Sequence, residues 1–164
     1  MIKPNTFDEL LLREKIMKLA LMQLNKKYVH GSHGPNEFDC AGFVWYVYNE
    51  IMNIDLYKGG YGKSTTTKIM TSIYGILREY EETLDKDISL IKEGDILFFH
   101  RQSKKDNKPT EFNKYPGHCG IYLGDNSFIH CSRTKGLVLK KDFSSDYWKR
   151  ILVGSKDIIT NYNK

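Results

Sequence analysis

One cysteine and two histidines stand out as residues whose types and spacing could carry chemistry. Cys40 directly follows Asp39 and begins the long apolar and aromatic run CAGFVWYVYNEIM. His118 and His130 come later in the chain, twelve residues apart. A cysteine attacks as its thiolate, and the pKa of a thiol falls at a helix N-terminus and beside an imidazolium. Together the three residues suggest a nucleophile, a general base and a third group that orients the base.

The alternative for Cys40 is a buried structural thiol, since free cysteine is among the most buried residue types. Cys40 taken alone favours that alternative. The combination favours catalysis. If the segment carrying the histidines packs over the start of the Cys40 helix, His118 can accept the thiol proton and return it to a leaving amine. His130 would then orient His118, and the backbone N–H of Cys40 would be an oxyanion donor.

Each histidine is followed by a cysteine, which raises the question of a zinc site. In a hairpin that turns at residues 124–126, neighbouring side chains point to opposite faces of the sheet. His118 and His130 then share one face, and Cys119 and Cys131 share the other. Neither pair alone is a convincing zinc site, so we expect no metal and no other cofactor. The two cysteines are expected to pack as small core residues, and a disulfide between them is left open.

The rest of the sequence predicts the elements that must position these residues. Apolar residues recur at near-helical spacing over residues 7–26, and the run from Cys40 is long enough for a buried helix with Asp39 at its N-terminal end. Ser64 can cap a further helix that continues through Leu77. Five segments that read as strands follow: DILFFHR, GHCGIYLG, SFIHCS, LVLKKD and KRILVGS. This order predicts an α+β fold, with N-terminal helices packed on an antiparallel sheet of about five strands.

The composition is that of one ordinary globular domain covering residues 1–164. No window approaches the roughly 18 apolar residues of a membrane span, so we expect no membrane insertion. The N-terminal segment lacks the apolar core of a signal peptide. These features fit four origins: release as a phage lysin, a place in a phage tail, export by a dedicated apparatus, or cutting from a larger protein. The net charge of +5 fits either an anionic partner such as a wall polymer or a Lys-rich surface. We expect no nucleic-acid partner, because no segment resembles a nucleic-acid-binding module.

Several motifs in order carry a resemblance to a known family. They are YVHGSHGPNEFDCAGFVWYVY, IKEGDILFF and GHCGIYLGDNSFIHCS, with DYWKRILVG near the end. The segment over residues 28–132 resembles the NlpC-type cell-wall cysteine peptidases, a bacterial branch of the papain-like superfamily. The resemblance implies a papain-like fold, Cys40 as nucleophile, His118 as base and His130 as the third polar residue. It also implies that Tyr28 borders the site and that Asp39 helps to hold the free amine of a peptidoglycan stem peptide.

The implied reaction is hydrolysis of the bond between γ-linked D-glutamate and the diamino acid of a bacterial peptidoglycan stem. Three features depart from the family pattern: Ala41 replaces a serine, His30 replaces a tryptophan, and residues 101–117 form a longer loop. Two alternatives stay open. One is an N-acetylmuramoyl-L-alanine amidase of the related CHAP type. The other is a catalytically silent module that binds the wall or belongs to a virion.

Overall fold

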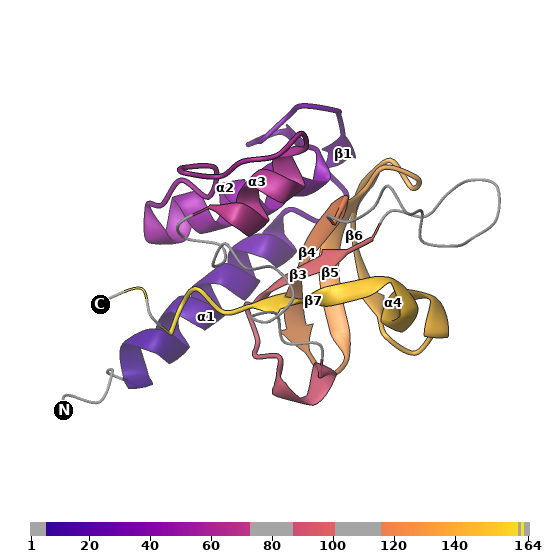
Figure 1. The fold of residues 1–164 in the computed structure, drawn as a ribbon. Helices are drawn as coiled ribbons and strands as arrows, with labels where there is room; N and C mark the ends of the chain where they lie inside the picture. The colour runs from indigo at the N-terminus through magenta and orange to yellow at the C-terminus, as the bar shows by residue number, and fades with distance from the viewer. Residues whose placement is uncertain (1–5, 73–86, 101–115, 161, 163–164) are drawn as a thin grey trace.

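The computed structural model describes residues 6–72, 87–100, 116–160 and 162, and Figure 1 shows their arrangement. Helices dominate the first half of the chain and strands the second half, as the sequence predicts. The elements in order are α1 (Thr6–Met22), β1 (Lys27–Tyr28), β2 (Glu37–Phe38), α2 (Cys40–Met52), α3 (Thr65–Thr71), the 3-10 helix η1 (Ile88–Leu90), β3 (Ile96–Phe99), β4 (His118–Gly124), β5 (Ser127–Ser132), β6 (Leu137–Asp142), α4 (Asp146–Ile151) and β7 (Leu152–Lys156).

The predicted helices form, with shorter ends than expected. α1 ends at Met22 instead of residue 26, and Asn25 adopts a left-handed conformation with φ of 69°. α2 confirms that the apolar run from Cys40 is a helix and not a strand. Ser64 caps α3 as predicted, with its hydroxyl accepting from the Thr67 N–H at 3.1 Å. The sequence predicts that this helix continues through Leu77, but it ends at Thr71, where Ser72 has an extended backbone. Residues 73–77 lie outside the described residues.

The strands form one sheet in the order β2-β1-β6-β5-β4-β3-β7. The five predicted strands are β3 to β7, and all their pairings are antiparallel. The prediction missed β1 and β2, which pair in parallel and make the sheet a mixed one of seven strands. Each of these two strands has only two residues. Such short strands show no alternation in the sequence, so pattern analysis cannot detect them.

The start of the last strand was predicted wrongly. Residues 149–151 were expected to begin it, but they form the last turn of α4, and β7 begins at Leu152. Ser145 precedes this helix, and Asp146 lies in its first turn, where a carboxylate is favourable. A helix of six residues is too short to show a helical repeat in the sequence.

Both faces of the sheet are covered. Helices α1, α2 and α3 lie on one side, and α4 lies beside the sheet near β7 and β6 (Figure 1). Side chains that alternate along the strands divide between two buried clusters. The larger cluster joins the sheet to the N-terminal helices and includes Phe43, Val44, Val47, Phe98, Cys119, Ile121, Ile129 and Cys131. The smaller one lies on the opposite face and includes Leu97, Phe99, Tyr122, Phe128, Phe143 and Ile151.

The hairpin of β4 and β5 turns where the sequence predicts. Gly124 pairs with Ser127, which leaves Asp125 and Asn126 as the turn. Their φ angles are 48° and 56°, the left-handed pair that a tight hairpin turn requires. A β-bulge between Tyr122 and Gly124 shifts the register, and beyond it Ile121 pairs with Ile129. That pairing places the side chains of His118 and His130 on the same face of the hairpin.

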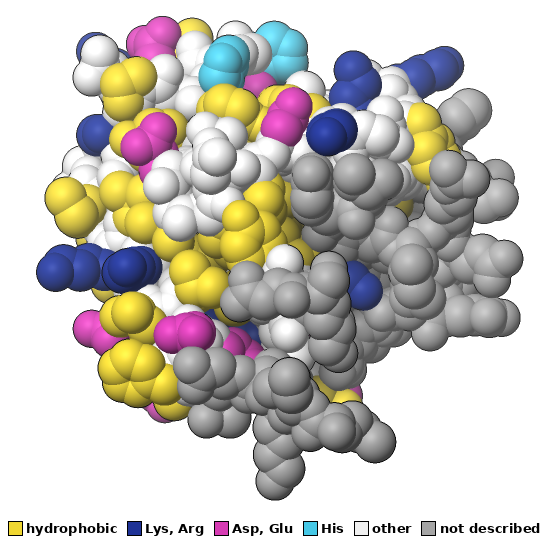
Figure 2. Space-filling view, turned by 90° about the vertical axis from the view of Figure 1, so that its left-hand side faces the viewer, with side chains coloured by type: hydrophobic (Ala, Val, Ile, Leu, Met, Phe, Trp, Pro, Cys, Tyr) yellow, Lys and Arg dark blue, Asp and Glu magenta, His cyan; other side chains and the backbone are white. Residues whose placement is uncertain are grey.

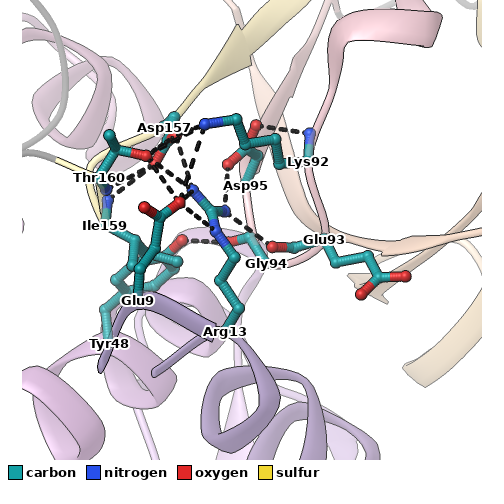
Figure 3. A network of polar contacts seen from close by, with 10 residues as sticks. All are labelled: Glu9, Arg13, Tyr48, Lys92, Glu93, Gly94, Asp95, Asp157, Ile159 and Thr160. Carbon is teal, nitrogen blue, oxygen red and sulfur yellow. Dashed lines mark hydrogen bonds and ion pairs between the residues drawn. The ribbon is translucent and has the colours of Figure 1, made fainter. Parts of the chain in front are cut away.

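A buried guanidinium ties three distant parts of the chain together (Figure 3). Arg13 of α1 is 5% exposed. Its Nη1 donates to Asp95 Oδ1 at 2.9 Å and its Nη2 to Asp157 Oδ2 at 2.7 Å. Glu9 accepts from its Nε at 3.0 Å, and the Glu93 carbonyl accepts from Nη1 at 2.8 Å. Residues far apart in the sequence thus hold α1 against the turn before β3 and the segment after β7.

Arg13→Met should destabilise the fold by about 3–5 kcal/mol, because it leaves the buried Asp95 carboxylate without its cation. The matched control is Lys92→Met, at the exposed rim of the same network, where the side chain is 53% exposed. We expect that control to cost less than about 1 kcal/mol. Urea unfolding followed by circular dichroism measures both, and equal midpoints for the two variants would contradict the assigned role of Arg13.

Charged side chains of both signs are interspersed on the face shown in Figure 2. The described basic residues on that face form no continuous patch, which fits a Lys-rich solvated surface. No helix within the described ranges is both long and apolar enough to cross a lipid bilayer.

Candidate active site

The start of α2 is held firmly by the loop before it. Asp39 is the N-cap residue: Oδ1 accepts from the Gly42 N–H at 2.6 Å, and Oδ2 from the Gly31 N–H at 3.0 Å. The Asp39 N–H donates to the Ser32 carbonyl at 2.7 Å. A Cβ on Gly42 would lie 2.1 Å from that same carbonyl oxygen, so only glycine allows this close approach. These contacts fix the position of Cys40 in the first turn.

His118 and His130 form the predicted pair. His118 Nε2 lies 2.7 Å from His130 Nδ1, and the two rings are nearly perpendicular at 84°. Burial, together with the charges of His118 and Lys141, lowers the pKa of His130 to about 2, so His130 stays neutral. A protonated His118 must donate through Nε2, which makes His130 Nδ1 the acceptor and places the His130 proton on Nε2. The geometry confirms that the two rings share one face of the hairpin.

The surroundings of Cys40 favour its thiolate. Cys40 is 8% exposed, and the pKa of its thiol is held well below the usual value. The largest cause is the neighbouring thiol of Cys119. Burial opposes the shift, and the hydrogen bond and charge of His118 and a contact with Thr66 add to it. Because Nε2 of His118 faces His130, Nδ1 is the nitrogen left to serve Cys40. The helix N-terminus favours negative charge at the same point.

A cleft of about 390 Å³ opens over these residues. Cys40 and Tyr28 line it from α2 and β1, and His118 and His130 from the hairpin. The other walls come from α4 and from the turn after β5, through Tyr147, Trp148, Ser132, Arg133 and Thr134. The nucleophile and its base therefore meet in a cavity large enough for part of a peptide chain.

Three contributors to the site were missed by sequence analysis. Trp148 stands edge-on to His130 with ring centroids 5.1 Å apart, and it also contacts His118 at 6.3 Å. Thr66 lies 3.6 Å from the Cys40 sulfur, measured from Oγ1. Arg133 lines the cleft and brings a positive charge to it. The motif DYWKRILVG pointed to the segment of Trp148, but nothing local marks Thr66 or Arg133.

The other predicted site residues lie close to the nucleophile. Tyr28 is half-buried and lines the cleft, as expected. Asp39 is buried, and burial raises the pKa of its carboxyl even though two backbone N–H groups bind it. Its evident task is to cap α2, and a contact with a substrate amine stays a prediction. Ala41 is buried in the core, whereas His30 and His33 are exposed.

Cys119 and Cys131 lie on the helix-facing side of the sheet, away from the histidine pair. Cys119 donates to the Cys40 carbonyl at 3.5 Å and Cys131 to the Phe38 carbonyl at 3.3 Å. Both are buried free thiols, which answers the question of a disulfide that the sequence left open.

His130→Phe should lower kcat about tenfold to a hundredfold, because the ring loses the nitrogen that accepts from a charged His118. His130→Asn keeps an acceptor and should recover part of the loss. The pH profile should contain no ionisation of His130, since its pKa of about 2 lies far below the working range. Steady-state kinetics against pH measures both effects, and full activity in His130→Phe would rule out the orienting role.

Comparisons with known proteins agree with this geometry. The NlpC/P60 family profile matches residues 25–157. The probable endopeptidase YafL of Escherichia coli is 29% identical over 139 residues, which are 84% of this chain and 47% of YafL. The probable peptidoglycan endopeptidase LytE of Bacillus subtilis is 28% identical over 87% of this chain and 33% of LytE. The gamma-DL-glutamyl hydrolase of the same species is 28% identical over 88% of this chain and 30% of that protein. This chain thus spans less than half the length of these curated relatives.

Solved structures confirm the papain-like fold. NlpC2 from Trichomonas vaginalis aligns with a TM-score of 0.64 and 26% identity, over 90% of this chain and 47% of that one. The NlpC/p60 domain of the peptidoglycan hydrolase SagA aligns with a TM-score of 0.54 and 24% identity, over 79% of this chain and 88% of that one. With a family profile that matches most of its length and a cysteine and two histidines gathered in one cleft, this chain belongs to the NlpC/P60 family.

Proposed function

We propose that this chain is a cysteine peptidase that hydrolyses an amide bond in the stem peptides of bacterial peptidoglycan. The observation that carries the proposal is the single cleft in which Cys40 begins a helix and His118, oriented by His130, faces it. A free thiol with a lowered pKa and a partner imidazole is the arrangement that acyl transfer through a thioester requires.

The geometry supports a two-step reaction. The Cys40 thiolate attacks the carbonyl carbon, and the oxygen that becomes negative is positioned for backbone N–H groups of the first turn of α2. His118 gives its proton to the leaving amine, which departs and leaves a thioester on Cys40. His118 then takes a proton from water, and the resulting hydroxide equivalent releases the acid and restores the thiolate. His130 stays neutral and holds the His118 ring in place throughout.

The proposed bond joins the γ-carboxyl of D-glutamate to the diamino acid. Support comes from the names of two relatives, a probable peptidoglycan endopeptidase and a gamma-DL-glutamyl hydrolase. Another relative is named a murein DD-endopeptidase, so the family acts on more than one bond. Tyr28, the residue implied to border the site, lines the same cleft as the nucleophile. Asp39, the residue implied to hold a free stem amine, directly precedes Cys40.

Digestion of purified peptidoglycan, followed by identification of the new amino termini, tests the proposal. The proposed bond gives a new terminus on the diamino acid, whereas an N-acetylmuramoyl-L-alanine amidase frees the amine of L-alanine. Cleavage between cross-linked stems would agree with the proposed cysteine mechanism but would contradict the proposed scissile bond. No new terminus on any wall, together with wall binding in a sedimentation assay, would favour the catalytically silent module.

We also propose that the domain meets its substrate in the cell wall. Release as a phage lysin, a place in a phage tail and a dedicated export apparatus stay predictions from the sequence. Fractionation of the producing cells and of any induced phage particles, with an antibody to the chain, would distinguish these routes.

A further inference from the structure

Two buried side chains contact Cys40 from the interior, and neither lines the cleft. Thr66 of α3 is 2% exposed, and Cys119 of β4 is fully buried. Thr66 Oγ1 lies 3.6 Å from Cys40 Sγ and 3.9 Å from Cys119 Sγ. Cys119 Sγ lies 3.5 Å from the Cys40 carbonyl oxygen. The nucleophile is therefore backed by a hydroxyl and a second thiol.

The position of Thr66 is built into the fold. Ser64 caps α3 through the Thr67 N–H, and the Thr71 hydroxyl donates to the Tyr61 carbonyl at 2.8 Å. A Cβ on Gly60 would lie 2.1 Å from the Lys68 carbonyl oxygen, so the loop before α3 packs tightly against the helix. These contacts hold α3 to the loop before it, and α3 also packs against α2. A small shift of α3 would separate Thr66 from the sulfur.

The number of available protons decides the direction of the hydrogen bonds. A hydroxyl has one proton, and within the described part of the chain the two sulfurs are the hydrogen-bond partners of the Thr66 hydroxyl. A thiolate can only accept. Cys119 keeps its own proton, because burial raises the pKa of its thiol well above the usual value. With Cys40 ionised, Thr66 therefore donates to Cys40, and Cys119 is left as a donor.

We propose that Thr66 is a positioning residue for the nucleophile, whose hydroxyl donates to the Cys40 thiolate from the buried side while His118 acts from the cleft. The proposal rests on Cys40 being the nucleophile of the proposed function. In this proposal His118 of β4 and Thr66 of α3 both stabilise the Cys40 thiolate. Cys119 completes the arrangement as a protonated thiol beside the same sulfur.

Other titratable groups also face Cys40. They are His118 and Cys119 from β4, Asp39 at the helix cap, Tyr57 from the loop after α2, and Cys131 from β5. Thr66→Val leaves all of them in place and removes one hydroxyl from a side chain of nearly the same shape. A change in the ionisation of Cys40 in that variant reports the lost hydrogen bond.

The test is the pH dependence of Cys40 alkylation by iodoacetamide, with the labelled cysteine identified by peptide mass mapping. Loss of a hydrogen bond to a charged group should move the Thr66→Val midpoint upward by about one pH unit. Thr66→Ser restores the hydroxyl and should return the midpoint to within a few tenths of the wild-type value. At pH values below the midpoint, kcat/KM of Thr66→Val on a stem-peptide substrate should be about tenfold lower than that of the wild type. At higher pH the two values should approach each other.

Thr65→Val is the matched control, since Thr65 is exposed and one residue away, and it should leave the midpoint unchanged. Should Thr66→Val fail to fold, Thr66→Ala removes the same hydroxyl with less bulk and should show the same shift. A folded Thr66→Val or Thr66→Ala with a wild-type midpoint would overturn the role of Thr66 and leave the proposed function standing. A wild-type midpoint near the ordinary cysteine value of about 8.5 would overturn both.

Discussion

Cys40→Ala is expected to reduce hydrolysis of peptidoglycan stem peptides by about 10⁴-fold or more, because Cys40 is the one thiol among the described residues that line the cleft. The variant should fold normally. Cys40 is 8% exposed, and losing one sulfur should cost about 1 kcal/mol. Release of the diamino acid, measured by chromatography with mass detection, gives the rate. Circular dichroism and thermal unfolding verify the fold.

The matched control for that variant is Cys131→Ala. This thiol is also buried and free, but it donates to the Phe38 carbonyl and does not line the cleft. We expect activity close to wild type. Comparable rates for Cys40→Ala and wild type would show that Cys40 is a structural thiol after all.

His118→Ala should lower kcat/KM by about 10³-fold or more, because both proton transfers lose their carrier. The variant should also lose the charge and the hydrogen bond that help to hold the pKa of the Cys40 thiol down. Alkylation of Cys40 near pH 6 should therefore slow, and the alkylation midpoint should move upward. These two readouts separate a chemical role from simple loss of packing.

His33→Ala is a suitable comparison for the histidine change. His33 is exposed and packs edge-on against Trp45, with ring centroids 5.2 Å apart, away from the catalytic cleft. It should retain wild-type kinetics. If His118→Ala instead kept both its rate and its alkylation profile, the base would have to be another residue.

Much of the site could be predicted because short-range rules fix it. A carboxylate before a long apolar run predicted the capped start of α2, and the period of two along β4 and β5 placed His118 and His130 on one face. The same period placed both neighbouring cysteines on the other face. Only the contact between the hairpin and the start of α2 is long-range. It could be predicted because a cysteine and a histidine together form a nucleophile and its base.

The remaining features depend on contacts that no local pattern records. Arg13 binds groups 80 or more residues away in the sequence, and Thr66 reaches Cys40 across 26 residues. α4 and the two-residue strands β1 and β2 are too short to show a period. For such features tertiary packing decides the structure, and intrinsic propensity carries little weight.

Partitioning of the reaction with hydroxylamine tests the acyl-enzyme most directly. Hydroxylamine competes with water for a thioester, so a stem peptide cut through Cys40 should yield the γ-hydroxamate of D-glutamate in place of part of the γ-carboxylic acid. The hydroxamate fraction should rise with hydroxylamine concentration, and its position identifies the bond that is cut. If only the carboxylic acid appears at every concentration while the diamino acid is still released, water attacks directly and the covalent role of Cys40 is contradicted.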